Sequence, residues 1–101
     1  MACEDRRGKI EAALRRACPK FRVGEIHEFE DDEIPDRTGK RHMGGCFVRF
    51  ERVHNMFGLW HREAMICDVT IKDPVALESW LRDDVGEVFM RAVGTKYRRT
   101  D

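Results

Sequence analysis

The histidines and cysteines of this sequence are the residues whose side chains could bind a metal ion. Structural zinc sites usually hold their ligands in closely spaced pairs, such as Cys-x2-4-Cys or His-x3-5-His. Only His42 and Cys46, with three residues between them, come close to such a spacing. One pair does not make a zinc site, so we predict no metal site and no cofactor. The potential ligands are His27, His42, Cys46, His54, His61 and Cys67.

Nucleophilic or acid–base catalysis is the second chemistry that these residue types could support. A catalytic cysteine needs a neighbouring base that a third group orients. Cys46 near His42 is the one candidate, but alternation of apolar residues makes Cys46 a buried strand thiol. The acidic run from Glu28 to Glu33 lacks the spacing of a calcium-binding loop, and runs of like charge are usually solvated. We therefore predict that the protein is not an enzyme and has no catalytic residue.

The charge balance limits the partners of the chain. Its 101 residues include 19 Lys and Arg and 19 Asp and Glu, so the formal net charge is zero. No long-range field therefore favours nucleic acid or a membrane, and self-association meets no electrostatic repulsion. No run approaches the roughly 18 to 20 apolar residues of a membrane span, and the four widely spaced cysteines suggest reduced thiols. We expect a cytoplasmic protein that does not bind membranes.

Helical periodicity marks both ends of the chain. Residues 4–18 have one apolar stripe, which Pro19 terminates. A second helix is expected to begin with Asp73 as its cap and Pro74 in its first turn, and to end near Gly94. Residues 83–86 could split this second helix in two. The two apolar stripes comprise Ile10, Ala13, Leu14, Ala17 and Cys18, and Leu77, Trp80, Leu81, Val85, Val88, Phe89 and Ala92.

Period-two alternation predicts three strands between these helices. The first, Phe21 to Phe29, changes phase at Gly24, which indicates a bulge. The other two, residues 46–51 and 65–71, are joined by a turn at residues 54–58. Residues 30–45 contain several turn signals and are expected to form an exposed loop, and residues 95–101 a basic tail. Alternation assigns one set of strand residues to the core: Cys46, Val48, Phe50, Met65, Cys67, Val69 and Ile71.

These elements predict one α+β domain spanning residues 1–101. A three-stranded antiparallel sheet with one apolar face needs a cover, which the N-terminal and C-terminal helices can supply from the same side. The expected architecture is a two-layer αβββα fold. Its opposite sheet face remains open to solvent or to a partner.

The residues assigned to that opposite face, and those near the predicted turn, form the candidate contact surface. Aromatic, methionine and arginine side chains are enriched at the centres of protein interfaces. The cluster near the turn could instead be a second small core, and the sequence leaves these alternatives open. The candidate interface residues are Phe47, Arg49, Met56, Phe57, Leu59, Trp60, Arg62 and Ile66.

By elimination, the sequence favours a noncatalytic binding or assembly module that acts through protein–protein contacts. Its partner would be another protein or a second copy, in the role of an inhibitor, an adaptor or a subunit of a larger assembly, including a viral or phage particle. A small metal-dependent or thiol-dependent enzyme is the third alternative.

The second alternative is nucleic-acid binding. The order helix, three strands, helix is similar to that of double-stranded RNA-binding domains, although the basic cluster that opens the last helix in that family is absent here. The candidate nucleic-acid residues are Lys40, Arg41, Lys96, Arg98 and Arg99.

Overall fold

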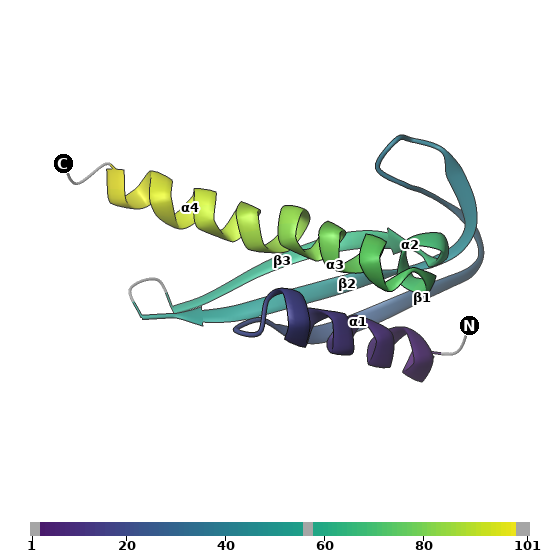
Figure 1. Cartoon of the computed structure of the whole chain (residues 1–101), viewed down its shortest axis with the longest axis horizontal. Coiled ribbons are helices and arrows are strands. Elements are labelled where there is room, and N and C mark those ends of the chain that lie inside the picture. The colour runs from purple at the N-terminus through teal and green to yellow at the C-terminus, as the bar shows by residue number, and fades with distance from the viewer. Residues whose placement is uncertain (1–2, 56–57, 99–101) are drawn as a thin grey trace.

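The computed structural model describes residues 3–55 and 58–98 of the chain. Helix α1 (Cys3–Ala17) precedes strands β1 (Arg22–Pro35), β2 (Arg41–His54) and β3 (Gly58–Cys67). Three helices then follow, α2 (Asp68–Lys72), α3 (Pro74–Leu81) and α4 (Glu87–Arg98), with a π-helical turn, η1 (Arg82–Gly86), between the last two (Figure 1).

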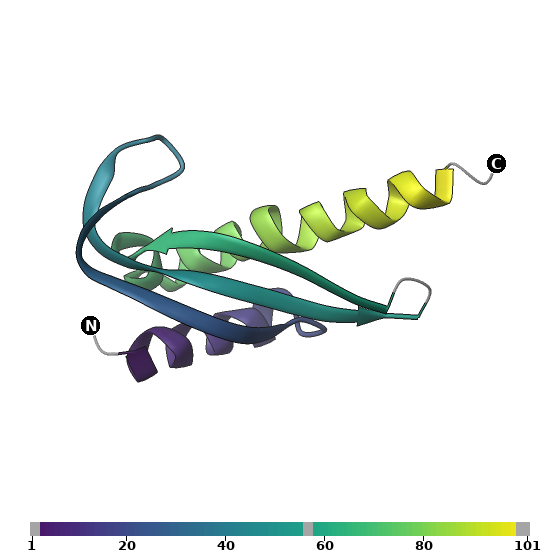
Figure 2. The ribbon, with the colours of Figure 1, turned by 180° about the vertical axis from the view of Figure 1, so that it is seen from behind.

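The three strands form one antiparallel sheet in the order β1-β2-β3. All helices lie on the same side of it, and the view from behind shows the other sheet face without a helix in front of it (Figure 2). This arrangement confirms the predicted α+β fold and its αβββα order. Cys46, Val48 and Phe50 of β2 are fully buried between the sheet and the helices, as their alternation predicts.

Strand β1 is longer than predicted. Its pairing with β2 shifts register between Val23 and Ile26, which confirms the bulge at Gly24, and shifts again between Phe29 and Glu33. The prediction of an exposed loop over residues 30–45 was wrong, because β1 continues to residue 35 and β2 begins at residue 41. Most charged residues there occupy exposed strand positions, where polar side chains are tolerated, whereas Ile34 of the same segment is buried at 3% exposure.

A tight turn at the end of this hairpin replaces the predicted loop. The carboxylate of Asp36 accepts hydrogen bonds from the backbone nitrogens of Thr38 (2.8 Å) and Lys40 (3.1 Å). Gly39 has φ of +88°, a conformation that glycine adopts without a steric penalty. These local bonds close the chain within five residues, so the turn signals were correct at residues 36–40 and misleading on either side.

The end of the last strand also differs from the prediction. We expected extended chain over residues 65–71, but β3 ends at Cys67 and α2 follows directly. Within α2 only one apolar side chain, Ile71, is buried at 1% exposure, whereas Val69 is 48% exposed. A single helical turn places Ile71 in the core as well as a strand would, so alternation alone could not distinguish the two structures.

The two terminal helices form largely as their sequences predict. Helix α1 buries Ile10, Ala13 and Leu14. Asp73 caps α3 by accepting hydrogen bonds from the backbone nitrogens of Val75 and Ala76 at 3.0 and 3.3 Å, and Pro74 occupies the first turn.

The end of the last helix differs from the prediction. The expected split at residues 83–86 is the π-helical turn η1 within a continuing helix. Gly94 does not end the helix, because α4 continues to Arg98.

Gly45 lets β2 and β3 approach each other next to α2. A Cβ atom at this position would lie 2.5 Å from the Ile66 carbonyl oxygen, a backbone atom that cannot move aside. We expect Gly45→Ala to lower the free energy of unfolding by about 1–3 kcal/mol in urea denaturation. In the matched variant Gly94→Ala nothing lies within 4 Å of the new methyl group, and helix propensity should raise stability by about 0.5–1 kcal/mol. Equal effects of the two changes would contradict this packing.

Candidate functional site

The sheet face that no helix covers, named here the open face, carries exposed apolar side chains. Cross-strand pairing places Val53 opposite Leu59 and Phe47 opposite Met65 on this face. Val53 is 68% exposed, Leu59 48% and Met65 41%, and Phe47 is partly buried. Each opposed pair makes an apolar contact across two strands, and the polar pairs Arg49–Glu63 and Glu51–His61 lie between the two apolar pairs. The open face includes Arg22, His27, Phe29, Met43, Phe47, Arg49, Glu51, Val53, Leu59, His61, Glu63 and Met65.

Charges on the open face pair with one another. Arg49 lies 3.0 Å from a carboxylate oxygen of Glu51 and 3.8 Å from one of Glu63, and Arg22 donates a hydrogen bond to Glu51 at 3.0 Å. The hydrogen bond from Arg49 and then that from Arg22 lower the pKa of Glu51. The open face therefore combines apolar side chains with charges that are neutralised within it.

The predicted interface residues divide between the two faces of the sheet. Phe47 and Arg49 lie on the open face, as expected, and Leu59, which was assigned to the cluster near the turn, lies there too. Ile66 faces Cys46 and is only 1% exposed, so its assignment to the contact surface was wrong. The error came from treating residues 65–71 as one strand, which gave Met65 the core position that Ile66 occupies. Met56 and Phe57 lie outside the described residues.

Trp60 belongs to an aromatic cluster at the far end of the core. Its ring meets those of Phe21 and Phe89 edge to face, with centroid separations of 5.8 and 5.3 Å. The guanidinium of Arg52 lies 4.2 Å from the Phe89 ring centroid. These contacts pack Trp60 against the main hydrophobic core beside α4, so Trp60 belongs neither to the open face nor to a second core.

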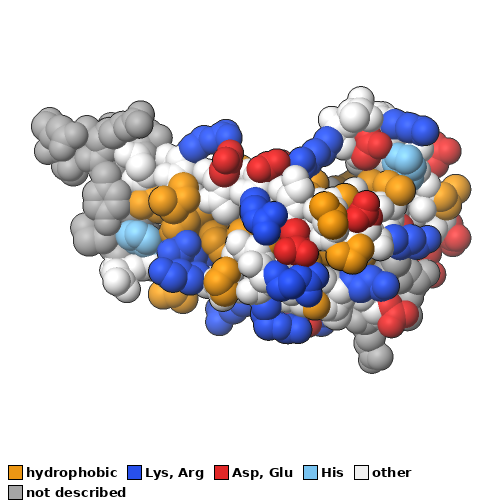
Figure 3. Space-filling model, viewed as in Figure 1, with side chains coloured by type: hydrophobic (Ala, Val, Ile, Leu, Met, Phe, Trp, Pro, Cys, Tyr) orange, Lys and Arg blue, Asp and Glu red, His pale blue; other side chains and the backbone are white. Residues whose placement is uncertain are grey.

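The nucleic-acid candidates lie at two separate places. Lys40 and Arg41 are exposed at the tip of the β1–β2 hairpin, where Arg41 donates to the Glu33 carbonyl at 2.8 Å and has its Nε 3.6 Å from the Glu33 carboxylate. Lys96 and Arg98 belong to the last turn of α4, but their side chains, like Arg99, lie outside the described part. Basic and acidic side chains are interspersed on the helix side of the molecule (Figure 3). Nucleic-acid binding stays an untested prediction.

His42 and Cys46 have different environments. Cys46 is fully buried, whereas the His42 ring nitrogen forms a hydrogen bond with Asp36 at 2.8 Å. The bonds from Thr38 and then from His42 hold the Asp36 pKa well below its usual value. Within residues 3–55 and 58–98, no group of three or more His, Cys, Asp or Glu side chains is placed to hold a metal ion. No helix in the described chain is long and apolar enough to cross a membrane.

A buried arginine is the principal feature that sequence reasoning missed. Arg6 of α1 is fully buried and donates two hydrogen bonds to the two carboxylate oxygens of Asp68, at 2.9 and 2.8 Å. It also bonds to Glu28 and lies 3.4 Å from a carboxylate oxygen of Glu30. The bonds from Arg6 lower the Asp68 pKa. One signal was available, since Arg6 lies four residues before Ile10 and so on the apolar stripe of its helix.

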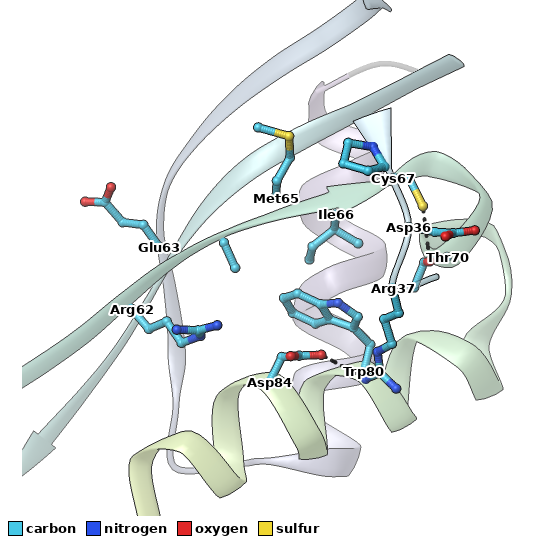
Figure 4. Close-up of a pocket in the computed structure, with 12 residues that line it drawn as sticks. Asp36, Arg37, Arg62, Glu63, Met65, Ile66, Cys67, Thr70, Trp80 and Asp84 are labelled. Atoms are coloured by element: carbon cyan, nitrogen blue, oxygen red, sulfur yellow. Dashed lines mark hydrogen bonds and ion pairs between the residues drawn. The ribbon is translucent and has the colours of Figure 1, made fainter. Parts of the chain in front are cut away.

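A groove follows the outer edge of β3, on the helix side of the sheet. Six consecutive strand residues, from Arg62 to Cys67, line a hollow of about 280 Å³ whose other walls are the hairpin end, Thr70, Trp80 and Asp84 (Figure 4). Residues 60–63 and Val88 of α4 line a second hollow of about 500 Å³ beside the first. The two hollows share Arg62 and Glu63, and together we call them the edge groove.

Comparison of the sequence with protein-family models gives no match. Comparison with curated proteins and with solved structures gives no match either. The function must therefore be argued from the geometry of the open face and the edge groove.

Proposed function

We propose that this protein is a noncatalytic protein-binding module that pairs with a second copy of itself through the open face. The observation behind this proposal is the set of exposed apolar side chains on a sheet face that no helix covers. Apolar side chains exposed together usually mark an interaction site. Phe47 and Met65 form one apolar pair and Val53 and Leu59 form another, and charged side chains of β2 and β3 lie between the two pairs.

Two features favour a second copy as the partner. The charges of the open face pair among themselves, so the face offers no excess charge that would select an acidic or a basic partner. The whole chain also has a formal net charge of zero, so two copies do not repel each other. In a twofold dimer the same patch is used on both subunits, so the apolar pairs of one copy can meet the apolar pairs of the other.

The test is the association state of the protein and its dependence on Phe47. We expect the unmodified protein to sediment as a dimer at ~100 µM, a concentration that populates even a micromolar complex. Phe47→Glu would place a carboxylate in the apolar contact and should weaken dimerisation at least ~10-fold, or about 1.4 kcal/mol. Leu59→Glu should act in the same direction. Sedimentation equilibrium measures all three proteins.

Val75 provides a matched control, because it is 77% exposed on α3, away from the open face. Val75→Glu adds the same charge and should leave the dimer unchanged. A protein that is monomeric at every concentration, or a dimer that Phe47→Glu and Leu59→Glu do not weaken, would overturn the proposal. Circular dichroism of each variant establishes that the fold is retained.

A further inference from the structure

Strand β3 has one unpaired edge. It pairs only with β2, and within the described residues no backbone hydrogen bond joins its other edge to another element. In an antiparallel sheet every second residue of an edge strand directs its N–H and C=O groups outward. Such an edge can accept a further strand from another chain, and proteins that do not use it usually shield it.

The edge groove borders this unpaired edge. Its opposite wall is formed by Trp80 of α3, Asp84 of η1 and Val88 of α4. One end is closed by Arg37 from the hairpin, which lies 3.2 Å from a carboxylate oxygen of Asp83 and 3.0 Å from one of Asp84. The helical wall and the closed end favour a single extended chain over the edge of a second folded sheet as the occupant.

Arg62 supplies the charge that selects the occupant. Its Nε is buried without a hydrogen-bond partner, as is Oδ2 of Asp84 in the helical wall. The Asp84 oxygen is paired with Arg37 at 3.0 Å, whereas no ion pair joins Arg62 to any described acidic residue. In Figure 4 its side chain points toward the helical wall, whereas those of Glu63 and Met65 point away. The other groove arginine, Arg37, is already paired with two carboxylates. A buried donor on a cation gains most from a carboxylate acceptor.

We propose that the edge groove binds an extended acidic peptide, which adds to β3 as a fourth strand and places one carboxylate on Arg62. Backbone hydrogen bonds to the edge supply affinity, as in other domains that bind peptides by strand addition, and Arg62 supplies selectivity. At ~3.4 Å per residue, the edge from Trp60 to Cys67 accommodates a peptide of about eight residues. This site lies along the edge of β3 on the helix side, shares His61, Glu63 and Met65 with the border of the open face, and goes beyond the proposed self-association.

The experiment uses the Phe47→Glu protein, so that the open face does not contribute. It is titrated with an array of acetylated peptides of about eight alternating threonine and valine residues, in which glutamate, glutamine or lysine replaces each position in turn. We expect one glutamate position to bind ~10-fold more tightly than its glutamine counterpart. Arg62→Met should remove this preference, whereas Arg91→Met, an exposed arginine on α4, should retain it.

Strand addition has a second signature that charge attraction alone lacks. N-methylation of the best peptide, one residue at a time, should abolish binding at alternate positions, because only alternate N–H groups face β3. Backbone amide resonances of residues 60–67 should shift and become protected from exchange. Three results would each overturn the proposal. The first is that no peptide binds at 1 mM (about −4 kcal/mol), and the second is that Arg62→Met leaves binding unchanged. The third is that protection of residues 60–67 rises with protein concentration in the absence of peptide.

Discussion

Arg6→Met is expected to lower the free energy of unfolding by about 3–5 kcal/mol, the usual cost of breaking a buried ion pair by removing one partner. Arg6 is fully buried, and its guanidinium holds the carboxylate of Asp68 through two hydrogen bonds and that of Glu28 through another. Methionine fills a similar length of space but leaves both carboxylates without their counter-charge. A domain of this size has about 5–15 kcal/mol of stability, so the variant should be close to unfolding in urea denaturation.

Arg16→Met is the matched control, because it changes the same residue type on the same helix. Arg16 is half-exposed and pairs with Glu78 at 3.1 Å, so its loss should cost no more than about 1 kcal/mol. The two variants should also differ in acid. The Asp68 pKa lies below its ordinary value of 3.8, so its contribution to stability is complete above that pH and is lost as the pH falls through the folded-state pKa.

This acid dependence follows from the Arg6 contact and should be weaker in Arg6→Met than in Arg16→Met. Urea denaturation at a series of pH values below 4 measures it (the ordinary aspartate pKa is about 3.9). A cost below 1 kcal/mol for Arg6→Met, with an unchanged pH profile, would show that the buried contact contributes no stability. It would also mean that α1 and α2 are held together by apolar packing alone.

Local signals were sufficient for the helices and for the order of the strands. Apolar spacing in α1, the Asp73–Pro74 start of α3 and the alternation of residues 46–51 each depend on neighbours within a few residues. Such patterns arise from the geometry of a single element and can be read without the rest of the fold. They were enough to predict two helices covering one face of a three-stranded antiparallel sheet.

Element ends depended on contacts that the sequence does not show. Strand β1 continues through a charged segment because β2 pairs with it, and propensity cannot reveal pairing across a hairpin. Strand β3 ends at Cys67, where Asp68 bonds to Arg6, a residue 62 positions earlier. No local pattern around Asp68 marks that bond.

The same missing contact explains why the candidate site was only partly correct. Taking residues 65–71 as one strand placed the alternating residues Met65, Cys67, Val69 and Ile71 on the core side. Ile66 was therefore assigned to the opposite, open face. The observed helix start at Asp68 exchanges the roles of Met65 and Ile66. The edge groove could not be foreseen either, because it requires the relative positions of β3, η1 and the hairpin end. Arg6 bonds to Asp68, the first residue of α2, directly after the end of β3.

The second large effect is expected for Phe89→Ala, which should lower the free energy of unfolding by about 3–5 kcal/mol. Phe89 of α4 is 2% exposed and lies at the centre of the aromatic cluster, with ring centroids 5.4 Å from Phe21 and 5.3 Å from Trp60. Its removal leaves a cavity and also takes the aromatic face away from Arg52. Urea denaturation monitored by tryptophan fluorescence would measure the loss.

The neighbouring Met90, 62% exposed on the same helix, supplies the control, since Met90→Ala should change stability by less than about 0.5 kcal/mol. Trp60→Ala extends the test to a residue that the sequence offered as an interface candidate. Because Trp60 packs on Phe21 and Phe89 and is absent from the open face, its loss should reduce stability and leave the dimerisation constant unchanged. If the Trp60→Ala protein kept full stability but did not dimerise, the aromatic cluster, and not the open face, would be the contact surface.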